Sequence, residues 1–232
     1  MNDAKWDQYG AIAGLIFVIL IVVGALIGGA PPNPDDSVRT VAKYYEDHTN
    51  AIKVGAFLTG FGSGAFLVFL GSVWATLRRS DDTRRLATIA VAGGVVGLVT
   101  AVTSFALNAA VALAIGTSGA TQSVNPKFIY LLSGVIAGMG NFGIAVFVAA
   151  VGVAALRTAV FPAAFGWASL VIALGWVVGG FVVATTASAI FAIGFIVFLV
   201  WLVWVLVLGF FLYRPPVPET AAPAPPAAAS TP

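Results

Sequence analysis

Six stretches of this chain have the length and apolar character of membrane-spanning helices, and this feature limits the fold more than any other. The stretches cover residues 10–30, 51–77, 86–116, 128–156, 162–185 and 189–213. A helix needs about 20 consecutive apolar residues to cross the hydrocarbon layer, and none of the six stretches contains Asp or Glu. Because a backbone in lipid must satisfy its own hydrogen bonds, the stretches predict an all-α bundle of six transmembrane helices.

Composition indicates the same class of protein. Of the 232 residues, 60% are hydrophobic and 9% are charged, whereas soluble domains carry about 45–50% apolar and about 25% charged residues. Too few polar side chains are present to cover a surface in water, which excludes a soluble enzyme, a nucleic-acid-binding domain and a disordered chain. The expected partner is the lipid bilayer, and no nucleic acid is expected. The sequence has no Cys, which excludes disulfides and thiolate-bound metal or haem.

The chain divides into three segments. Residues 1–9 form a short N-terminal segment, residues 10–214 form the transmembrane domain, and residues 215–232 form a tail of almost only Pro and Ala. Such a tail cannot build a packed core, so it is predicted to be disordered. Turn signals separate the spans, among them Pro31-Pro32 after the first span and Asn125-Pro126 before the fourth, where Asn suits an N-cap and Pro the first helical position.

The basic residues predict an orientation. An even number of spans places both termini on one side, and basic residues gather on the cytoplasmic side. With cytoplasmic termini, seven basic residues lie inside and four outside. The inside set is Lys5, Arg78, Arg79, Arg84, Arg85, Arg157 and Arg214, and the outside set is Arg39, Lys43, Lys53 and Lys127. The sequence therefore predicts a multi-pass membrane protein with both termini in the cytoplasm.

A short amphipathic helix is predicted in the loop after the first span, over residues 34–48. Asn33 can cap it, and Pro34 suits its first position. Apolar residues then recur at helical spacing, with charged residues on the other faces. They are Val38, Val41, Ala42 and Tyr45. We expect this helix to lie flat on the membrane or to cap the bundle.

His48 is the only histidine and ends this segment beside Glu46 and Asp47. A metal-binding or pH-sensing role is one interpretation, because nearby carboxylates raise the proton affinity of an imidazole. One His with two acidic residues makes a poor metal site, so we favour a solvated helix end. No cofactor and no metal site are predicted.

Glycine pairs four residues apart indicate how the helices pack, because small residues let helix backbones approach closely in lipid. Such pairs occur at Gly10/Gly14, Gly24/Gly28, Gly60/Gly64, Gly93/Gly97, Gly134/Gly138 and Gly175/Gly179. We expect them to pack helices within the chain, with contacts between copies of the chain as the alternative. The last span has no such pair and is rich in Phe, Val, Leu and Trp, so we expect it at the lipid-facing edge of the bundle.

Two asparagines are the main polar candidates within the spans, which have no charged residue in their interiors. Asn108 lies in the third span and Asn141 in the fourth. One interpretation has the two amides facing each other across a solute pathway. The alternative, which we favour, is hydrogen bonding between helices, worth about 1 kcal/mol for each residue.

Sequence patterns of known membrane enzymes are missing. The chain has no HExxH motif, no GxSxG motif, and no His or paired Asp within a span. These groups would supply the metal ligands, acids and bases that hydrolysis in a membrane requires. The sequence therefore predicts a protein that is not an enzyme.

Three segments together carry a resemblance to known proteins. They are residues 41–48 with their Tyr-Tyr-Glu-Asp-His ending, Leu77-Arg78 at the end of the second span, and residues 156–167 with Phe161-Pro162 and Trp167. The chain resembles an uncharacterised family of small polytopic membrane proteins from actinobacteria. Members often have a basic residue and Trp after the proline, where this chain has Ala163-Ala164. The resemblance implies six membrane helices and no particular reaction.

Two hypotheses about function follow from these features. The first is a structural or accessory component of the bacterial inner membrane without enzymatic activity, which acts with a membrane-protein partner or with further copies of itself. The second is a carrier or pore for a neutral or lipid-like solute, with Asn108 and Asn141 lining its path. A cavity between the third and fourth spans would favour the second hypothesis, and a closed, dry bundle would favour the first.

Overall fold

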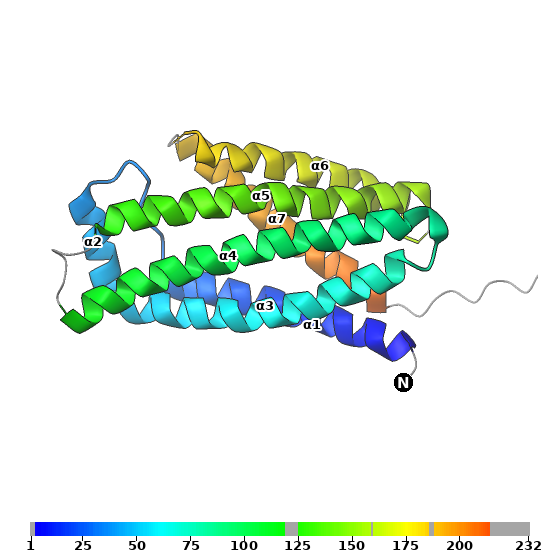
Figure 1. Cartoon of the computed structure of the whole chain (residues 1–232), viewed down its shortest axis with the longest axis horizontal. Helices are drawn as coiled ribbons and strands as arrows, with labels where there is room; N and C mark the ends of the chain where they lie inside the picture. Colours follow the sequence, from blue (N-terminus) through cyan, green and yellow to red (C-terminus); the bar gives the residue numbers. More distant parts are fainter. Residues whose placement is uncertain (1–2, 119–124, 159, 186–187, 214–232) are drawn as a thin grey trace, which may run out of the picture.

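The computed structural model describes residues 3–118, 125–158, 160–185 and 188–213. Within these residues the chain folds into seven α-helices and no strand (Figure 1). The helices are α1 (Asp3–Gly28), α2 (Val38–Asp47), α3 (Thr49–Leu77), α4 (Arg84–Ser118), α5 (Pro126–Arg157), α6 (Ala163–Gly180) and α7 (Ser188–Tyr213). All except α2 are long and apolar enough to cross a membrane. The predicted all-α bundle of six spans is confirmed, and the chain is a multi-pass membrane protein.

Helix bounds differ from the expected spans mainly at two places. Helix α1 begins at Asp3, within the expected N-terminal segment, and Asp7 forms an ion pair there with Arg79 in the turn after α3. Helix α6 ends at Gly180, and a 3-10 turn, η2 (Phe181–Val183), follows it. The predicted disordered tail, residues 215–232, lies outside the described residues.

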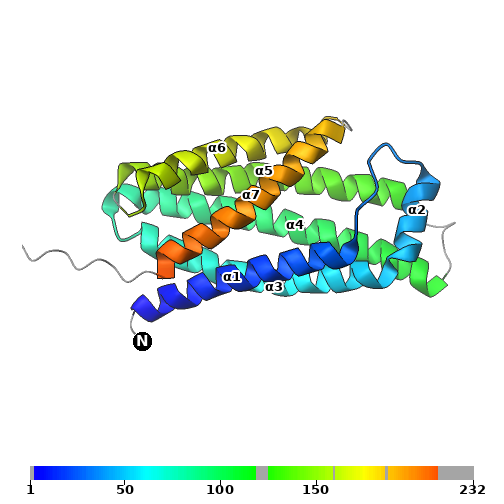
Figure 2. The same cartoon turned by 180° about the vertical axis from the view of Figure 1, so that it is seen from behind.

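The six long helices form a closed ring. Each of α3, α4, α5, α6 and α7 packs against the long helix before it, and α7 also packs against α1. Helix α7 runs obliquely across the bundle from the end of α6 to the first half of α1 (Figure 2). We call the end of the bundle that carries α2 the α2 end. The opposite end, with Arg78 and Arg79 directly after α3 and Arg84 and Arg85 at the start of α4, is called the arginine end.

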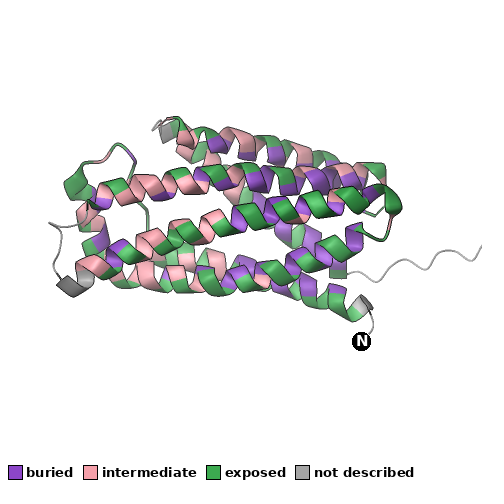
Figure 3. Cartoon of the chain, viewed as in Figure 1, coloured by how far each residue is buried: buried purple, intermediate pink, exposed green. Residues whose placement is uncertain are grey.

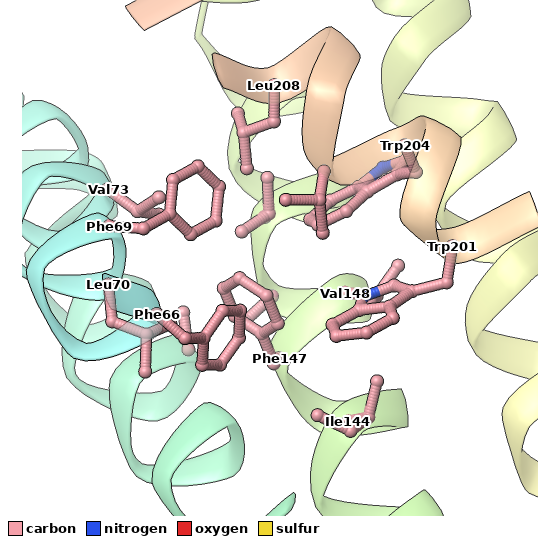
Figure 4. Packing of buried hydrophobic residues seen from close by; sticks show 14 of the residues in the cluster. Phe66, Phe69, Leu70, Val73, Ile144, Phe147, Val148, Trp201, Trp204 and Leu208 are labelled. Carbon is pink, nitrogen blue, oxygen red and sulfur yellow. The ribbon is translucent and has the colours of Figure 1, made fainter. Parts of the chain in front are cut away.

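Side-chain packing is densest toward the arginine end. Figure 3 shows that buried residues of α5 gather in that half, whereas residues near the α2 end are largely intermediate or exposed. The core there is aromatic: Phe66 of α3, Phe147 of α5, and Trp201 and Trp204 of α7 converge on one another (Figure 4). One face of α7 is therefore buried in the core, while its other faces carry exposed apolar residues, as expected for a helix at the lipid-facing edge.

Glycines bring α4 and α5 into close contact. A Cβ atom on Gly93 would lie 2.6 Å from the carbonyl oxygen of Gly143, and one on Gly97 would lie 3.4 Å from that of Gly140. Of the other expected packing positions, Gly24 lies against Gly55, Gly138 against Val182 and Val183, Gly175 against Val197, and Gly179 against Gly194. A Cβ on Gly28, Gly60, Gly64 or Gly134 would meet no atom within 4 Å. These four glycines therefore make no close helix contact with the residues that the structure describes.

Helix α2 caps the bundle but begins later than predicted. Its N-cap is Ser37, whose Oγ accepts a hydrogen bond from the Thr40 N–H at 3.1 Å, so the expected cap at Asn33 is wrong. Asn33 instead forms a separate turn, in which its N–H donates to the Asp36 carboxylate at 2.8 Å. Of the predicted apolar stripe, Val41 and Tyr45 are fully buried. They pack on Val111 and Ala112 of α4, so α2 lies against the bundle.

Candidate ligand cavity

A groove opens on one side of the bundle near the α2 end. Helix α7 touches α1 near the arginine end, where a Cβ on Gly209 would lie 3.5 Å from the Ala11 carbonyl oxygen. Toward the α2 end the two helices diverge (Figure 2) and form the walls of a groove of about 1370 Å³, with α4 and α5 at its base. Leu26 of α1 and Phe195 of α7 line it and remain 76% and 60% exposed. The groove is therefore open sideways, at the level of the membrane-spanning helices.

A smaller deep chamber continues the groove into the bundle. It has a volume of about 380 Å³, and all six long helices contribute to its walls. Ser104, Phe105, Gly134, Val182, Phe191, Phe195 and Phe198 line both the groove and the deep chamber. Since the two spaces share these walls, they form one path from the side of the bundle to its centre.

Aromatic side chains close the deep chamber toward the arginine end. The ring of Phe66 lies 4.7 Å from that of Phe17 and 5.9 Å from that of Trp201, measured between centroids. Behind them, Phe147 contacts Trp204 edge to face at 5.5 Å. Phe66, Phe147, Trp201 and Trp204 belong to the dense core shown in Figure 4, so the path is a dead end in this conformation.

The path is apolar along its whole length. Within the described residues, no Asp, Glu, Lys, Arg or His lines either space. Most lining residues are Phe, Val, Leu, Ile, Ala and Gly, with few hydroxyl and amide groups among them. Apolar walls with a small number of polar groups are typical of sites for small organic molecules. A cavity without charge suits an uncharged molecule, because a buried unpaired charge is costly.

Asn108 lies in the wall of the groove and is fully occupied by protein contacts. Its Nδ2 donates to the Ser104 carbonyl at 2.8 Å and to the Ser133 hydroxyl at 3.0 Å. Its Oδ1 accepts a 2.5 Å hydrogen bond from the phenol of Tyr45. Asn108 therefore joins α4 to both α2 and α5, which is the hydrogen bonding between elements that we favoured from the sequence.

Asn141 lies in the deep chamber, at the midpoint of α5, and differs from Asn108 in its contacts. Its side chain is half-buried and makes no hydrogen bond with the residues that the structure describes. It lies about 12 Å along α5 from Ser133, the partner of Asn108, at the usual rise per residue. The two amides therefore do not face each other, but they line successive parts of the same path.

Two indole groups in the deep chamber's wall also lack partners. Trp176 and Trp201 are buried, and in the described part of the chain neither Nε1–H has a hydrogen-bond acceptor. An unpaired buried donor costs about 1–3 kcal/mol. By contrast, the Nε1–H of Trp204, outside the chamber, donates to Ser169 at 2.8 Å. Neither Trp176 nor Trp201 stands out in the sequence as a site residue, because Trp in an apolar span is commonly a packing residue.

The loop after α1 closes the groove at the α2 end. Tyr44 donates from its hydroxyl to the Gly28 carbonyl at 3.1 Å, and Tyr130 donates to the Pro32 carbonyl at 2.5 Å. Lys127 Nζ donates to the Asp36 carbonyl at 2.7 Å. These bonds tie the loop to α2 and to the start of α5. The polar ends of these three side chains are therefore engaged with the backbone of the loop.

His48 belongs to this closing structure. Its ring stacks on Tyr44 with 4.8 Å between centroids, and its Nδ1–H donates to the Tyr44 carbonyl at 3.0 Å. Gly29, which packs against the ring, has a positive φ of 67°, a conformation that favours glycine. No group of three His, Cys, Asp or Glu side chains within the described residues is placed to hold a metal ion. His48 ends α2 as expected, but its ring is half-buried against Tyr44 and the loop rather than solvated.

Tyr44 and Tyr45 are shielded from water by this packing. Burial raises the pKa of the Tyr45 phenol above its ordinary value, and the neighbouring Tyr130 and Tyr44 raise it further. Burial also raises the pKa of Tyr44. Both phenols therefore stay neutral hydrogen-bond donors at physiological pH, as their bonds to Asn108 and Gly28 require.

Comparison with known proteins identifies no relative: no family model, curated protein or solved structure matches this chain.

Proposed function

We propose that this chain binds an uncharged, lipid-like molecule and acts as a carrier for it in the membrane. The observation that carries the proposal is the apolar path that begins between α1 and α7 and ends in the deep chamber. A closed bundle would suit a purely structural component, whereas a path of this size exposes apolar walls that an apolar ligand would cover. The proposal is for a binding role, since the amide, hydroxyl and indole groups on the walls are not general acids or bases at neutral pH.

The position of the opening supports entry from the bilayer. The groove opens sideways along membrane-spanning helices, and exposed Leu26 and Phe195 border it. A lipid-like molecule can therefore pass from the hydrocarbon layer into the groove without crossing water. At the α2 end, the Tyr44 and Tyr130 hydrogen bonds hold the loop after α1 across the groove.

The basic residues favour one orientation for this carrier. With the arginine end in the cytoplasm, the bundle obeys the positive-inside rule, and the groove opens to the outer half of the bilayer. We therefore propose a protein of a bacterial inner membrane with both termini in the cytoplasm. Such a carrier takes up its ligand from the outer leaflet, and the closed arginine end must rearrange for release to the other side.

A filled-path variant tests the proposal. Gly134 lines both the groove and the deep chamber, and a Cβ there meets no atom within 4 Å. Gly134→Leu should fill the path without breaking a helix contact. We expect wild-type protein purified in mild detergent to retain neutral lipid, measured by mass spectrometry of an organic extract. The variant should retain several-fold less.

Gly60→Leu is the matched control, because Gly60 lies on the exposed face of α3 and its Cβ also meets no atom within 4 Å. This variant should retain as much lipid as wild type. Equal retention by wild type and Gly134→Leu would overturn the proposal. Wild-type protein that carries no lipid but co-purifies with a membrane protein in fixed ratio would favour the accessory role instead.

A further inference from the structure

One amide on the wall of the deep chamber has no hydrogen-bond partner. Asn141 lines the chamber, is half-buried, and forms no hydrogen bond with the residues that the structure describes. The Nε1–H groups of Trp176 and Trp201 also lack acceptors among these residues, but both nitrogens are fully buried, so a ligand in the chamber does not reach them. Two hydroxyl groups of the wall are occupied: Thr59 donates to the Gly55 carbonyl at 2.9 Å, and Ser63 donates to the Thr59 carbonyl at 2.7 Å.

The surroundings of Asn141 favour a ligand that supplies a hydrogen-bond partner for its unpaired amide. In a low-dielectric site an unpaired polar group is disfavoured, and its hydrogen bond is stronger than in water. Glycines keep the space near the amide open, since a Cβ on Gly179 would lie 3.5 Å from Asn141 Nδ2. The Asn141 amide is therefore a polar point within apolar and aromatic walls, in the middle of the membrane-spanning part of the chain.

We propose that Asn141 is the recognition residue for the ligand's polar group, and that the ligand is an uncharged amphiphile with an acceptor oxygen at one end. The Nδ2 of Asn141 donates to this oxygen, which is a hydroxyl, carbonyl or ether oxygen. The oxygen enters first, and the apolar body of the ligand extends from the deep chamber into the groove. This inference rests on the proposed function, because it names the class of molecule that the same cavity holds.

The direction of binding follows from the contrast between the two asparagines. Both Nδ2 hydrogens of Asn108 already have acceptors in Ser104 and Ser133, and the nearby phenols of Tyr44 and Tyr130 donate to backbone carbonyls. These three side chains therefore offer a ligand no free donor, whereas Asn141 in the deep chamber does. A molecule with one acceptor gains more by placing it at Asn141.

Three matched probes test the proposal on the full chain in detergent. Farnesol carries a hydroxyl group, its methyl ether retains only an acceptor oxygen, and farnesene has the same type of apolar chain without oxygen. Their affinities are measured by displacement of tritium-labelled farnesol. For wild type we expect farnesol and the ether to bind within about two-fold of each other, and farnesene to bind about five-fold more weakly, as one hydrogen bond predicts.

Two variants test which asparagine recognises the oxygen of the ligand. Asn141→Leu should remove the preference for farnesol over farnesene, whereas Asn108→Leu should preserve it. Equal wild-type binding of farnesol and farnesene overturns the inference while leaving the proposed function intact, and no binding of any probe overturns the proposed function itself. An ether as weak as farnesene overturns the assignment of an acceptor oxygen. The wild-type comparison decides these outcomes even if Asn141→Leu does not fold.

Discussion

The phenol of Tyr45 donates a hydrogen bond of 2.5 Å to Oδ1 of Asn108, and this bond joins the short helix α2 to the membrane-spanning helix α4. Asn108 in turn donates to Ser133 of α5 at 3.0 Å. Tyr45 itself is fully buried. One amide therefore connects three helices beside the groove, so α2 contributes to the position of the groove's walls.

Replacing Tyr45 by Phe should loosen α2. The variant retains the ring but leaves Oδ1 of Asn108 without its donor, at a cost of about 1 kcal/mol. We expect faster hydrogen exchange at the amides of residues 38–47, measured by mass spectrometry. Tyr213→Phe is the control, because Tyr213 is exposed at the end of α7. Unchanged exchange in Tyr45→Phe would show that packing alone holds α2.

Docking of α2 should also weaken in alkaline solution. Burial raises the pKa of Tyr45 and of Tyr44 in the folded chain, so the folded state holds these phenolic protons more tightly than the unfolded state does. The resulting stability is fully present below pH of about 10, the unfolded value, and is lost as pH rises through the folded pKa values. Tyrosinate absorbance at 295 nm should therefore show phenols that titrate later than free tyrosine, in step with faster exchange in α2. Ordinary titration of all the phenols would contradict this account.

The spans were predictable from sequence because the hydrocarbon layer imposes a length and a composition on each helix. The helix caps and the helix contacts were harder to predict, because several residues in the sequence are equally suited to each role. Asn33 and Ser37 are both good N-caps, and the chain uses Ser37 because Asn33 is engaged in the turn with Asp36. Likewise, the pairs Gly60/Gly64 and Gly93/Gly97 look alike in sequence, but only the second faces a neighbouring helix.

The cavity was beyond sequence analysis for a different reason. Polar residues in apolar spans indicated Asn108 and Asn141, but their roles depend on which groups lie near them in space. The path itself follows from the oblique course of α7, which meets α1 near Ala11 and leaves it toward the α2 end (Figure 2). A crossing angle of this kind is set by side-chain fit between distant segments. No local pattern in the sequence encodes it.

The close contact between α4 and α5 should not tolerate a methyl group. A Cβ on Gly93 would lie 2.6 Å from the Gly143 carbonyl oxygen and 2.8 Å from the backbone nitrogen of Phe147. Backbone atoms cannot rotate away, so Gly93→Ala must separate the helices. We expect it to destabilise the bundle by about 1–3 kcal/mol, measured as a lower melting temperature in detergent.

Gly60→Ala provides the comparison for this prediction. The added methyl group meets no atom within 4 Å, and alanine is the better helix former, so the melting temperature should stay the same or rise. Equal losses at Gly93 and Gly60 would mean that the contact between α4 and α5 is looser than described.

Orientation can be tested directly because the chain has no native Cys. Asp35 and Asp82 are both exposed acidic residues, the first in the loop at the α2 end and the second in the turn at the arginine end. In intact cells a membrane-impermeant thiol reagent should label Asp35→Cys, while Asp82→Cys should react only after the membrane is opened. This outcome follows from the excess of basic residues at the arginine end, since basic loops remain in the cytoplasm. The reverse labelling pattern would place the groove on the cytoplasmic half of the bilayer, and the proposed carrier would then take up its ligand from the inner leaflet.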